Sequence, residues 1–222
     1  MHRQRIIETN EGIQDAMEVT VFDDFARTMR DKGWNNVDTF VRKGISRGRV
    51  LEIGPGPGYV GLEWLKRAPD AKLTALEISD EMIRVAKRNA QQYGLTDRVQ
   101  YMQGNAMAMP FEENAFDGVF SNGSLHEWEK PLAVFQEIHR VLKAGGLFCV
   151  TDMRRDVNPL LAKLIYHTTK PKEIRPGFIT SLNAAYTVGE LTEILRNSDF
   201  EDFSVTPDFF GLTATGRKQS MR

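Results

Sequence analysis

A run of closely spaced glycines constrains the fold of this chain more than any other feature of its sequence. Gly54, Gly56 and Gly58 directly follow the strand-like run of residues 49–53, and a helical run continues to about residue 66. Glycines at such spacing permit a tight turn between a strand and a helix, and they let the backbone approach a bound molecule closely. The pattern therefore predicts a strand, a loop shaped for a ligand and then a helix.

The alternation of strand and helix continues along residues 49–152. Ser79 is a suitable N-cap for a helix that Gly94 ends, and Pro131 opens another helix. Strands that are separated by helices form parallel sheets through right-handed crossovers. The strand-like runs after the first are residues 72–78, 99–102, 116–121 and 147–151.

The last part of the chain has a different pattern. A helical run at residues 187–197 precedes two strand-like runs, 201–207 and 209–215, which only a residue or two separates. Such closely spaced strands form an antiparallel hairpin. The expected fold class is therefore α/β. It is a Rossmann-like, seven-stranded, mostly parallel sheet with an antiparallel C-terminal hairpin, helices on both faces and an N-terminal helical lid.

Two segments lie outside this alternation. Residues 1–47 carry apolar side chains at helical spacing, so we expect an N-terminal helical cap there and the main domain at residues 48–222. Residues 153–186 contain three prolines and break the strand and helix pattern. We interpret this stretch as an insertion that forms a lid or contributes to a substrate site.

The composition excludes several classes of protein. The chain has 222 residues, with 29 Lys and Arg against 30 Asp and Glu, and this balance disfavours nucleic-acid binding by bulk charge. No apolar run approaches the ~20 residues of a membrane span, and the N-terminus lacks a signal-peptide core. A single cysteine excludes a disulfide framework. We expect a cytoplasmic protein that acts on a small molecule, without a nucleic-acid or membrane partner; the oligomeric state stays open.

The glycine loop matches two cofactor motifs at once. Gly56, Gly58 and Gly61 fit the dinucleotide pattern G-x-G-x-x-G, with Glu77 about 20 residues later. Glu52 and the glycines at 54, 56 and 58 fit the acidic loop of S-adenosylmethionine enzymes. An acid at the end of the second strand suits the ribose of either cofactor.

The chemistry of the loop favours S-adenosylmethionine. A pyrophosphate needs free backbone N–H donors, and Pro55 and Pro57 remove two of them. Glu52 places an anion where the pyrophosphate would lie, whereas S-adenosylmethionine presents an ammonium and a sulfonium. Two alternatives stay open at this point: an NAD(P)-dependent oxidoreductase that uses the same loop, and a non-catalytic S-adenosylmethionine-binding protein.

The core resembles a class I S-adenosylmethionine-dependent methyltransferase of the type 11 group, which includes the ubiquinone/menaquinone C-methyltransferases. The similarity covers residues 49–152 strongly and 187–215 in outline. The segments that carry it are residues 50–58, 76–79, 104–111, 116–121 and 141–146. These motifs are specific for the fold and the cofactor and say little about the acceptor.

The resemblance implies a role for each predicted cofactor residue. The loop glycines would pass close to the methionyl part, Glu77 would bind the ribose diol and Ile78 would flank the adenine. Asn105 stands where relatives usually have an Asp that accepts from the adenine amino group, and Ser121 would lie beside the transferred methyl group. The complete predicted set is Glu52, Gly54, Gly56, Gly58, Glu77, Ile78, Asn105, Ala106 and Ser121.

Methyl transfer from a sulfonium is an in-line displacement with a neutral leaving group. Positioning alone can contribute roughly 7–11 kcal/mol, and a general base is needed only for a weak nucleophile. His126 follows the fourth strand and is the candidate base or substrate contact, although it could simply pack the loop together with Trp128. Cys149 has apolar neighbours and is expected to be structural. The histidines are scattered, so no metal site is predicted.

The insertion carries an excess of basic residues. On a nearly neutral chain this asymmetry suggests an anionic substrate group held under a lid, and a solvated basic face is the alternative. Aromatic residues such as Tyr166 could line the site or belong to the core. The predicted substrate residues are Trp128, Arg154, Arg155, Tyr166 and Arg175.

Overall fold

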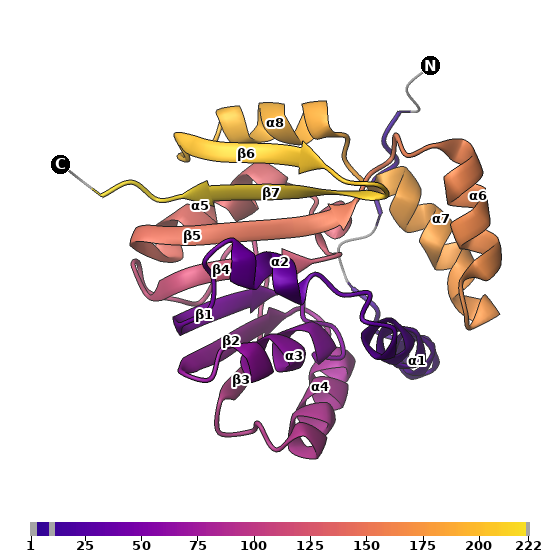
Figure 1. The fold of residues 1–222 in the computed structure, drawn as a ribbon, viewed down its shortest axis with the longest axis horizontal. Coiled ribbons are helices and arrows are strands. Elements are labelled where there is room, and N and C mark those ends of the chain that lie inside the picture. The colour runs from indigo at the N-terminus through magenta and orange to yellow at the C-terminus, as the bar shows by residue number, and fades with distance from the viewer. Residues whose placement is uncertain (1–3, 9–11, 221–222) are drawn as a thin grey trace.

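Seven strands form one mixed sheet in the computed structural model, which describes residues 4–8 and 12–220 (Figure 1). The strand order is β3-β2-β1-β4-β5-β7-β6, and β1 to β5 pair in parallel. β7 pairs antiparallel with both β5 and β6. The predicted fold class is therefore confirmed. The strands are β1 Gly48–Ile53, β2 Ala71–Glu77, β3 Val99–Gln103, β4 Phe116–Asn122, β5 Leu142–Met153, β6 Asp202–Pro207 and β7 Gly211–Arg217.

Helices cover both faces of the sheet because the strand side chains alternate between two apolar clusters. Leu51 and Ile53 of β1 belong to the cluster that α5 and α8 complete. Val50 belongs to the other cluster, which α2 and α3 complete, and α4 packs beside α3. These helices are α2 Val37–Arg42, α3 Tyr59–Arg67, α4 Asp80–Tyr93, α5 Pro131–Val141 and α8 Val188–Arg196.

The capping residues begin and end helix α4 where the sequence predicts. The Ser79 hydroxyl accepts a hydrogen bond from the N–H of Met82 at 3.2 Å, and acidic residues occupy the first turn. Gly94 ends the helix in the left-handed conformation, with φ 65°. This helix holds the loop after β2 in place, and that loop forms part of the site described below.

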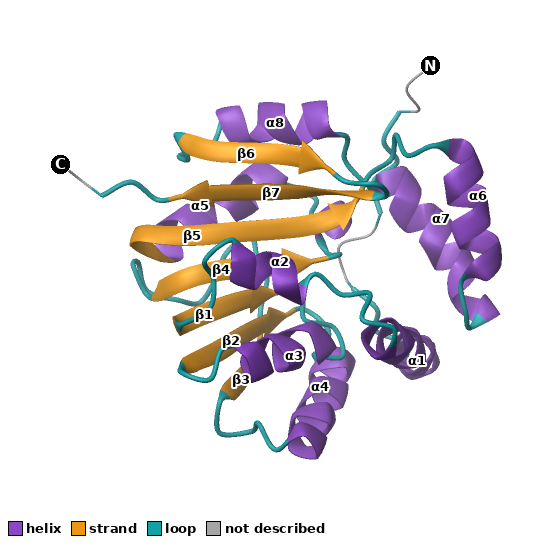
Figure 2. Cartoon of the chain, in the orientation of Figure 1, coloured by secondary structure: helices purple, strands orange, loops and turns teal. Residues whose placement is uncertain are grey.

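Three helices gather beyond the carboxyl ends of the parallel strands: α1 Ala16–Asp31, α6 Pro159–Thr168 and α7 Arg175–Ala184 (Figure 2). A short 3-10 turn, η2 Lys172–Ile174, joins α6 to α7. The segment interpreted as an insertion is therefore mainly helical. Pro159 and Pro176 lie in the first turns of their helices, where a missing N–H costs no hydrogen bond.

The two N-terminal helices have different surroundings. Val37 and Phe40 of α2 are fully buried, and the Phe40 ring stacks on Phe120 of β4 with 4.6 Å between centroids. Helix α2 thus contributes to the core, whereas α1 lies over the edge of the sheet. Residues 1–3 and 9–11 of the predicted cap are outside the described residues, and the division into cap and main domain stays a prediction.

Two expectations from composition concern single features of the fold. Cys149 of β5 is fully buried among apolar residues, as expected for a structural thiol. Among the described residues, no helix is both long enough and apolar enough to cross a bilayer.

Candidate cofactor and acceptor site

A cavity of about 930 Å³ lies at the carboxyl ends of the parallel strands. The glycine loop, the ends of β2 and β4, and helices α1 and α7 bound it. The strand order reverses between β1 and β4, and ligands of open α/β sheets bind at such a reversal. The volume is in the range of small-molecule sites. Gly54, Gly56, Glu77, Ile78, Asn105, Ala106, His126 and Trp128 are the predicted residues that line it.

The glycine loop uses all of its own N–H donors. Gly54, Gly56 and Gly58 have φ between 53° and 84°, which favours glycine. Their N–H groups donate to the Leu76 carbonyl at 2.9 Å, the Glu77 carboxylate at 3.0 Å and the Pro55 carbonyl at 2.9 Å, respectively. The two prolines between them have no N–H. Residues 54–58 therefore offer no free donor to a pyrophosphate, and this disfavours a dinucleotide.

Glu77 ends β2 with its carboxylate fixed at the cavity wall. One oxygen accepts from the N–H groups of Ile78 at 2.9 Å and Ser79 at 3.0 Å, and the other accepts from Gly56. Burial raises the pKa of Glu77, and these three hydrogen bonds oppose that rise. A carboxylate has about four acceptor sites, so capacity for a ligand hydroxyl remains.

The turn after β3 supplies a second wall of the cavity. The Asn105 side-chain oxygen accepts from the N–H of Met107 at 2.8 Å, which shapes the turn. Ala106 and Met107 line the cavity with apolar side chains, as Ile78 does from the end of β2.

Glu52 lies beneath the glycine loop and does not line the cavity. Its side chain is on the Val50 face of β1, next to Gly61, where an added Cβ would fall 2.1 Å from a carboxylate oxygen. The Gly61 N–H donates to this carboxyl group, and burial raises the pKa of Glu52 to about 8. Glu52 supports the turn from below. The sequence analysis expected Glu52 to place a negative charge at the ligand, and this expectation is wrong because the side chain does not border the cavity.

Two further predicted cofactor residues also lie behind the wall. Ser121 is fully buried. Its hydroxyl donates to the Ile53 carbonyl at 2.8 Å and lies 2.7 Å from the Ser124 hydroxyl. Ser124 lines the cavity in its place. Gly58 faces Tyr101 and α4, where an added Cβ would meet the Tyr101 hydroxyl at 2.7 Å. These residues shape the loop and do not border the cavity.

His126 points into the cavity from the 3-10 turn η1 Leu125–Glu127. Its Nδ1 lies 2.9 Å from the Asp152 carboxylate, which also accepts from the His126 backbone N–H at 2.8 Å. Its Nε2 lies 3.7 Å from a Glu8 carboxylate oxygen. Burial alone would lower the pKa of His126, but Asp152 outweighs it and raises the pKa to about 9. His126 is therefore a hydrogen-bond donor at neutral pH.

The sequence analysis missed Asp152 and Glu8 as partners of His126. The position of Asp152 carried a signal, because it ends the strand next to the one that η1 follows, and the ends of parallel strands meet at one edge. Glu8 has no such signal, since it reaches the site from the N-terminal segment. The hydrogen bonds of Arg5 to the carbonyls of Ala184 and His126 hold that segment in place.

Trp128 lines the cavity and also packs the loop, which are the two roles that the sequence analysis considered for it. Its ring borders the cavity and also packs edge-on against Phe135, with 5.6 Å between centroids. Its carbonyl accepts from the Tyr186 hydroxyl at 3.3 Å. The residue is therefore held rigidly where a ligand could contact it.

The remaining predicted substrate residues do not reach the cavity. Arg155 donates to the Ala185 carbonyl and to the Glu190 carboxylate. Arg175 donates to backbone carbonyls of the segment after α6, and its guanidinium lies 5.7 Å from the Tyr166 ring centre. Arg154 lies 3.7 Å from the Asp156 carboxylate. These arginines hold the insertion together, so the structure does not support the expected anion site there.

Apolar residues form the outer wall, and the sequence analysis did not assign most of them to a site. They come from α1, the loop that follows it, η2 and α7, and they continue the cavity away from the glycine loop. Their helical spacing in α1 indicated only an amphipathic helix. The main members are Met17, Phe22, Phe25, Met29, Trp34, Ile174 and Phe178.

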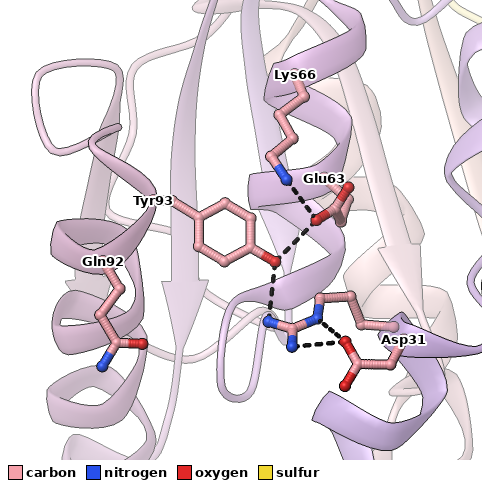
Figure 3. Close-up of a pocket in the computed structure, with 6 residues that line it drawn as sticks. Asp31, Glu63, Lys66, Gln92 and Tyr93 are labelled. Atoms are coloured by element: carbon pink, nitrogen blue, oxygen red, sulfur yellow. Dashed lines mark hydrogen bonds and ion pairs between the residues drawn. The ribbon is translucent and has the colours of Figure 1, made fainter.

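Polar contacts fasten α1 across the sheet edge. Arg30 donates to the Tyr93 hydroxyl at 3.1 Å, and that hydroxyl donates to Glu63 at 2.8 Å (Figure 3). Nearer the other end of the helix, the Asp23 carboxylate accepts from Arg88 at 2.6 Å. A polar hollow of about 520 Å³ surrounds the Tyr93 network, and its charged groups pair with one another. We interpret it as a structural latch for α1.

Comparison with known proteins identifies the family. A methyltransferase domain model of the type 11 group matches residues 51–150. A ubiquinone/menaquinone biosynthesis C-methyltransferase of Dinoroseobacter shibae is 30% identical over 115 residues, which are 52% of this chain and 46% of that protein. Residues 51–150 are thus a methyltransferase domain of the class I, S-adenosylmethionine-dependent type. The sterol 24-C-methyltransferase of Saccharomyces cerevisiae is 36% identical over 166 residues, or 72% of this chain and 41% of that enzyme.

The chain spans less than half the length of these two curated relatives. A crystal structure from Methanococcus maripaludis, described as a candidate S-adenosylmethionine-dependent methyltransferase, has a TM-score of 0.75 and 24% identity. The match covers 98% of this chain and 99% of that one, so the shared fold extends over nearly the whole chain.

The cavity of this methyltransferase fits its cofactor. Gly54 and Gly56 have no Cβ to obstruct a ligand, and Glu77 presents acceptor capacity for hydroxyl donors. The lack of free N–H donors in the loop is no obstacle to a cofactor that carries a sulfonium and an ammonium. The described residues contain no cluster of three or more His, Cys, Asp or Glu that could hold a metal ion.

Proposed function

We propose that this methyltransferase methylates an apolar small molecule, which binds between α1 and α7 with its reacting end beside His126. The cavity wall carries this proposal, because its outer part is built from methionine and aromatic side chains of α1, η2 and α7. A wall of this kind binds apolar surface and gains its binding energy from removing that surface from water. The two curated relatives are named for quinone and sterol acceptors, which are also largely apolar.

The charges at the cavity support a neutral acceptor rather than an anionic one. Arg30 and His126 are the basic residues among those that line it. Arg30 is engaged by Tyr93 and Asp31. Acidic residues are more numerous, and they are Glu8, Glu18, Glu77, Glu127, Glu129 and Glu173.

S-Adenosylmethionine, when bound, supplies a methyl group on a positively charged sulfur. In our proposal Glu77 accepts hydrogen bonds from the ribose hydroxyls, because the three backbone N–H groups fix the orientation of its carboxylate. Ile78 and Ala106 flank the adenine, and Asn105 contacts its edge. Gly54 and Gly56 let the methionyl part approach the backbone.

His126 positions the acceptor by a hydrogen bond and can exchange a proton with it. The Nε2–H can donate to an oxygen of the acceptor, while Asp152 fixes the ring through Nδ1. A hydroxyl or enol proton that leaves during methyl transfer can be accepted by Nε2 in the neutral form of His126, in which the one ring proton stays on Nδ1 beside Asp152. Positioning is the larger contribution, because the displacement has a neutral leaving group.

A methyl-transfer screen tests the proposed function. The purified chain is incubated with labelled S-adenosylmethionine and with the organic and aqueous fractions of a cell extract, and labelled products are identified by mass. We expect label in an organic-soluble product, little label with Glu77→Ala, and full label with Asp117→Asn, whose side chain lies at the opposite end of the sheet beside Lys143. Label only in water-soluble anions would overturn the proposed acceptor class. No label in either fraction would favour a non-catalytic binding protein.

A further inference from the structure

Helix α6 presents an apolar face that nothing in the described protein covers. No residue of α6 is buried. Leu160 and Leu164 lie one turn apart on the same face, with 78% and 60% of their surface exposed. Leu161, Ile165 and Tyr166 are partly buried, whereas Leu160 and Leu164 stay outside the packed side of the helix. Its exposed leucines therefore indicate a binding surface.

Basic residues accompany this apolar face. Lys163 lies between the two leucines in sequence, and Lys170 and Lys172 follow the helix. All three are exposed, and none forms an ion pair with any residue in the described ranges. The arginines of the insertion bond to groups within the protein, as described above. The three lysines are the basic residues of the insertion to which the proposed function gives no role.

The same segment leads directly into the cavity. Helix α6 packs against α7, and Figure 1 shows α6 as the outer helix of this pair. Thr169 and Ile174 of the connection between the two helices line the cavity, and so does Phe178 of α7. Phe178 also stacks on Phe210 with 6.0 Å between ring centres. The neighbouring Phe209, at the turn between β6 and β7, is 80% exposed.

We propose that α6, together with Lys163, Lys170 and Lys172, docks on an anionic lipid surface and brings the mouth of the cavity to the bilayer. An exposed apolar helix face beside lysines is the pattern of interfacial helices, which lie in the headgroup region while the lysines contact anionic lipids. The inference rests on the proposed function in one respect, since an apolar acceptor would concentrate in the bilayer. This contact is peripheral and needs no spanning segment, and it departs from the sequence expectation of no membrane partner.

Vesicle flotation of the full chain tests the proposal without cofactor or acceptor, so its failure is separate from a failure of methyl transfer. We expect the chain to float with vesicles of phosphatidylcholine and phosphatidylglycerol, and much less with phosphatidylcholine alone or at high salt. Lys170→Gln with Lys172→Gln should lower the partition coefficient about fivefold for each lysine removed. Leu160→Ser with Leu164→Ser should lower it more than tenfold.

Matched controls separate docking from general charge and from misfolding. Lys72→Gln with Lys87→Gln removes two exposed lysines from β2 and α4 and should leave flotation unchanged. All variants should keep their affinity for S-adenosylhomocysteine, which reports an intact fold. Wild-type chain that stays unbound, or leucine and lysine variants that float like wild type, would overturn the proposal. So would self-association of the wild type, lost in the leucine variant, because the face would then belong to a second copy of the chain.

Discussion

The imidazole of His126 and the carboxylate of Asp152 meet at the ends of two adjacent parallel strands, with Nδ1 2.9 Å from Oδ2. The same carboxylate accepts from the His126 backbone N–H, so ring and main chain are fixed together. This pair leaves Nε2 as the nitrogen that faces the cavity. It places a proton-carrying group where the acceptor must bind in the proposed function.

Replacing Asp152 by Asn should lower the pKa of His126 from about 9 toward its ordinary value of 6.5. The folded-state pKa is raised, so the pair contributes stability that is complete below about pH 6.5 and is lost as the pH rises through 9. Near pH 6 we expect Asp152→Asn to cost up to about 3 kcal/mol. Histidine NMR titrations and denaturant unfolding at several pH values measure both effects. Asp156→Asn is the control, and an unchanged His126 pKa in Asp152→Asn would contradict the assignment.

Replacing Glu52 by Gln tests whether this residue supports the loop or holds the cofactor. The pKa of Glu52 is raised from 4.5 to about 8, so wild-type stability is complete below about pH 4.5 and declines as the pH rises through 8. The variant lacks this decline and should be more stable at pH 8, by a few kcal/mol at most. Calorimetry should show unchanged S-adenosylhomocysteine affinity. A tenfold loss would mean that Glu52 reaches the cofactor.

Adding one methyl group at Gly54 should disturb the site more than the same change at Gly123. Both glycines have positive φ, which costs roughly 1–2 kcal/mol for alanine. The Cβ of alanine at position 54 would also fall 2.6 Å from the Ser124 Cβ, whereas position 123 has nothing within 4 Å. We expect Gly54→Ala to lose more stability and to bind S-adenosylhomocysteine poorly. Equal denaturation midpoints and equal affinities for the two variants would refute this account of the loop.

Removing the Tyr93 hydroxyl should loosen the latch of α1. Tyr93→Phe breaks the link from Arg30 to Glu63, while the ring keeps its packing. The hydrogen bonds are partly exposed, so global stability should fall by only about 1 kcal/mol. Hydrogen exchange should accelerate in α1 and not in the sheet. Arg196→Gln removes an exposed ion pair to Glu193 in α8, away from this network, and serves as the control. Unchanged exchange in α1 would show that the latch contributes nothing.

The fold was predictable because its signals are local. Each strand of the parallel sheet is a short apolar run, and the caps at Ser79 and Gly94 act within one helical turn. That Gly54, Gly56 and Glu77 border the cavity was predictable for the same reason, since they lie at the ends of two neighbouring strands. These residues meet at one edge in any parallel sheet of this order.

The errors arose where a motif was followed instead of strand geometry. Side chains of a strand alternate between its faces, so Glu52 had to lie opposite Ile53, which borders the cavity. Ser121 pairs with Ile53 across the sheet and is buried by the turn that carries Ser124. Arg155 and Arg175 were misjudged for another reason. Their partners are mainly backbone carbonyls, and composition carries no information about those.

Parallel calorimetric titrations with S-adenosylhomocysteine and with NAD test the central claim most directly. The loop has no free N–H donor for a pyrophosphate, and Glu77 offers a fixed carboxylate for the ribose. We therefore predict saturable binding of S-adenosylhomocysteine, at least tenfold weaker binding in Glu77→Ala, and no binding of NAD. Binding of NAD without binding of S-adenosylhomocysteine would contradict the account.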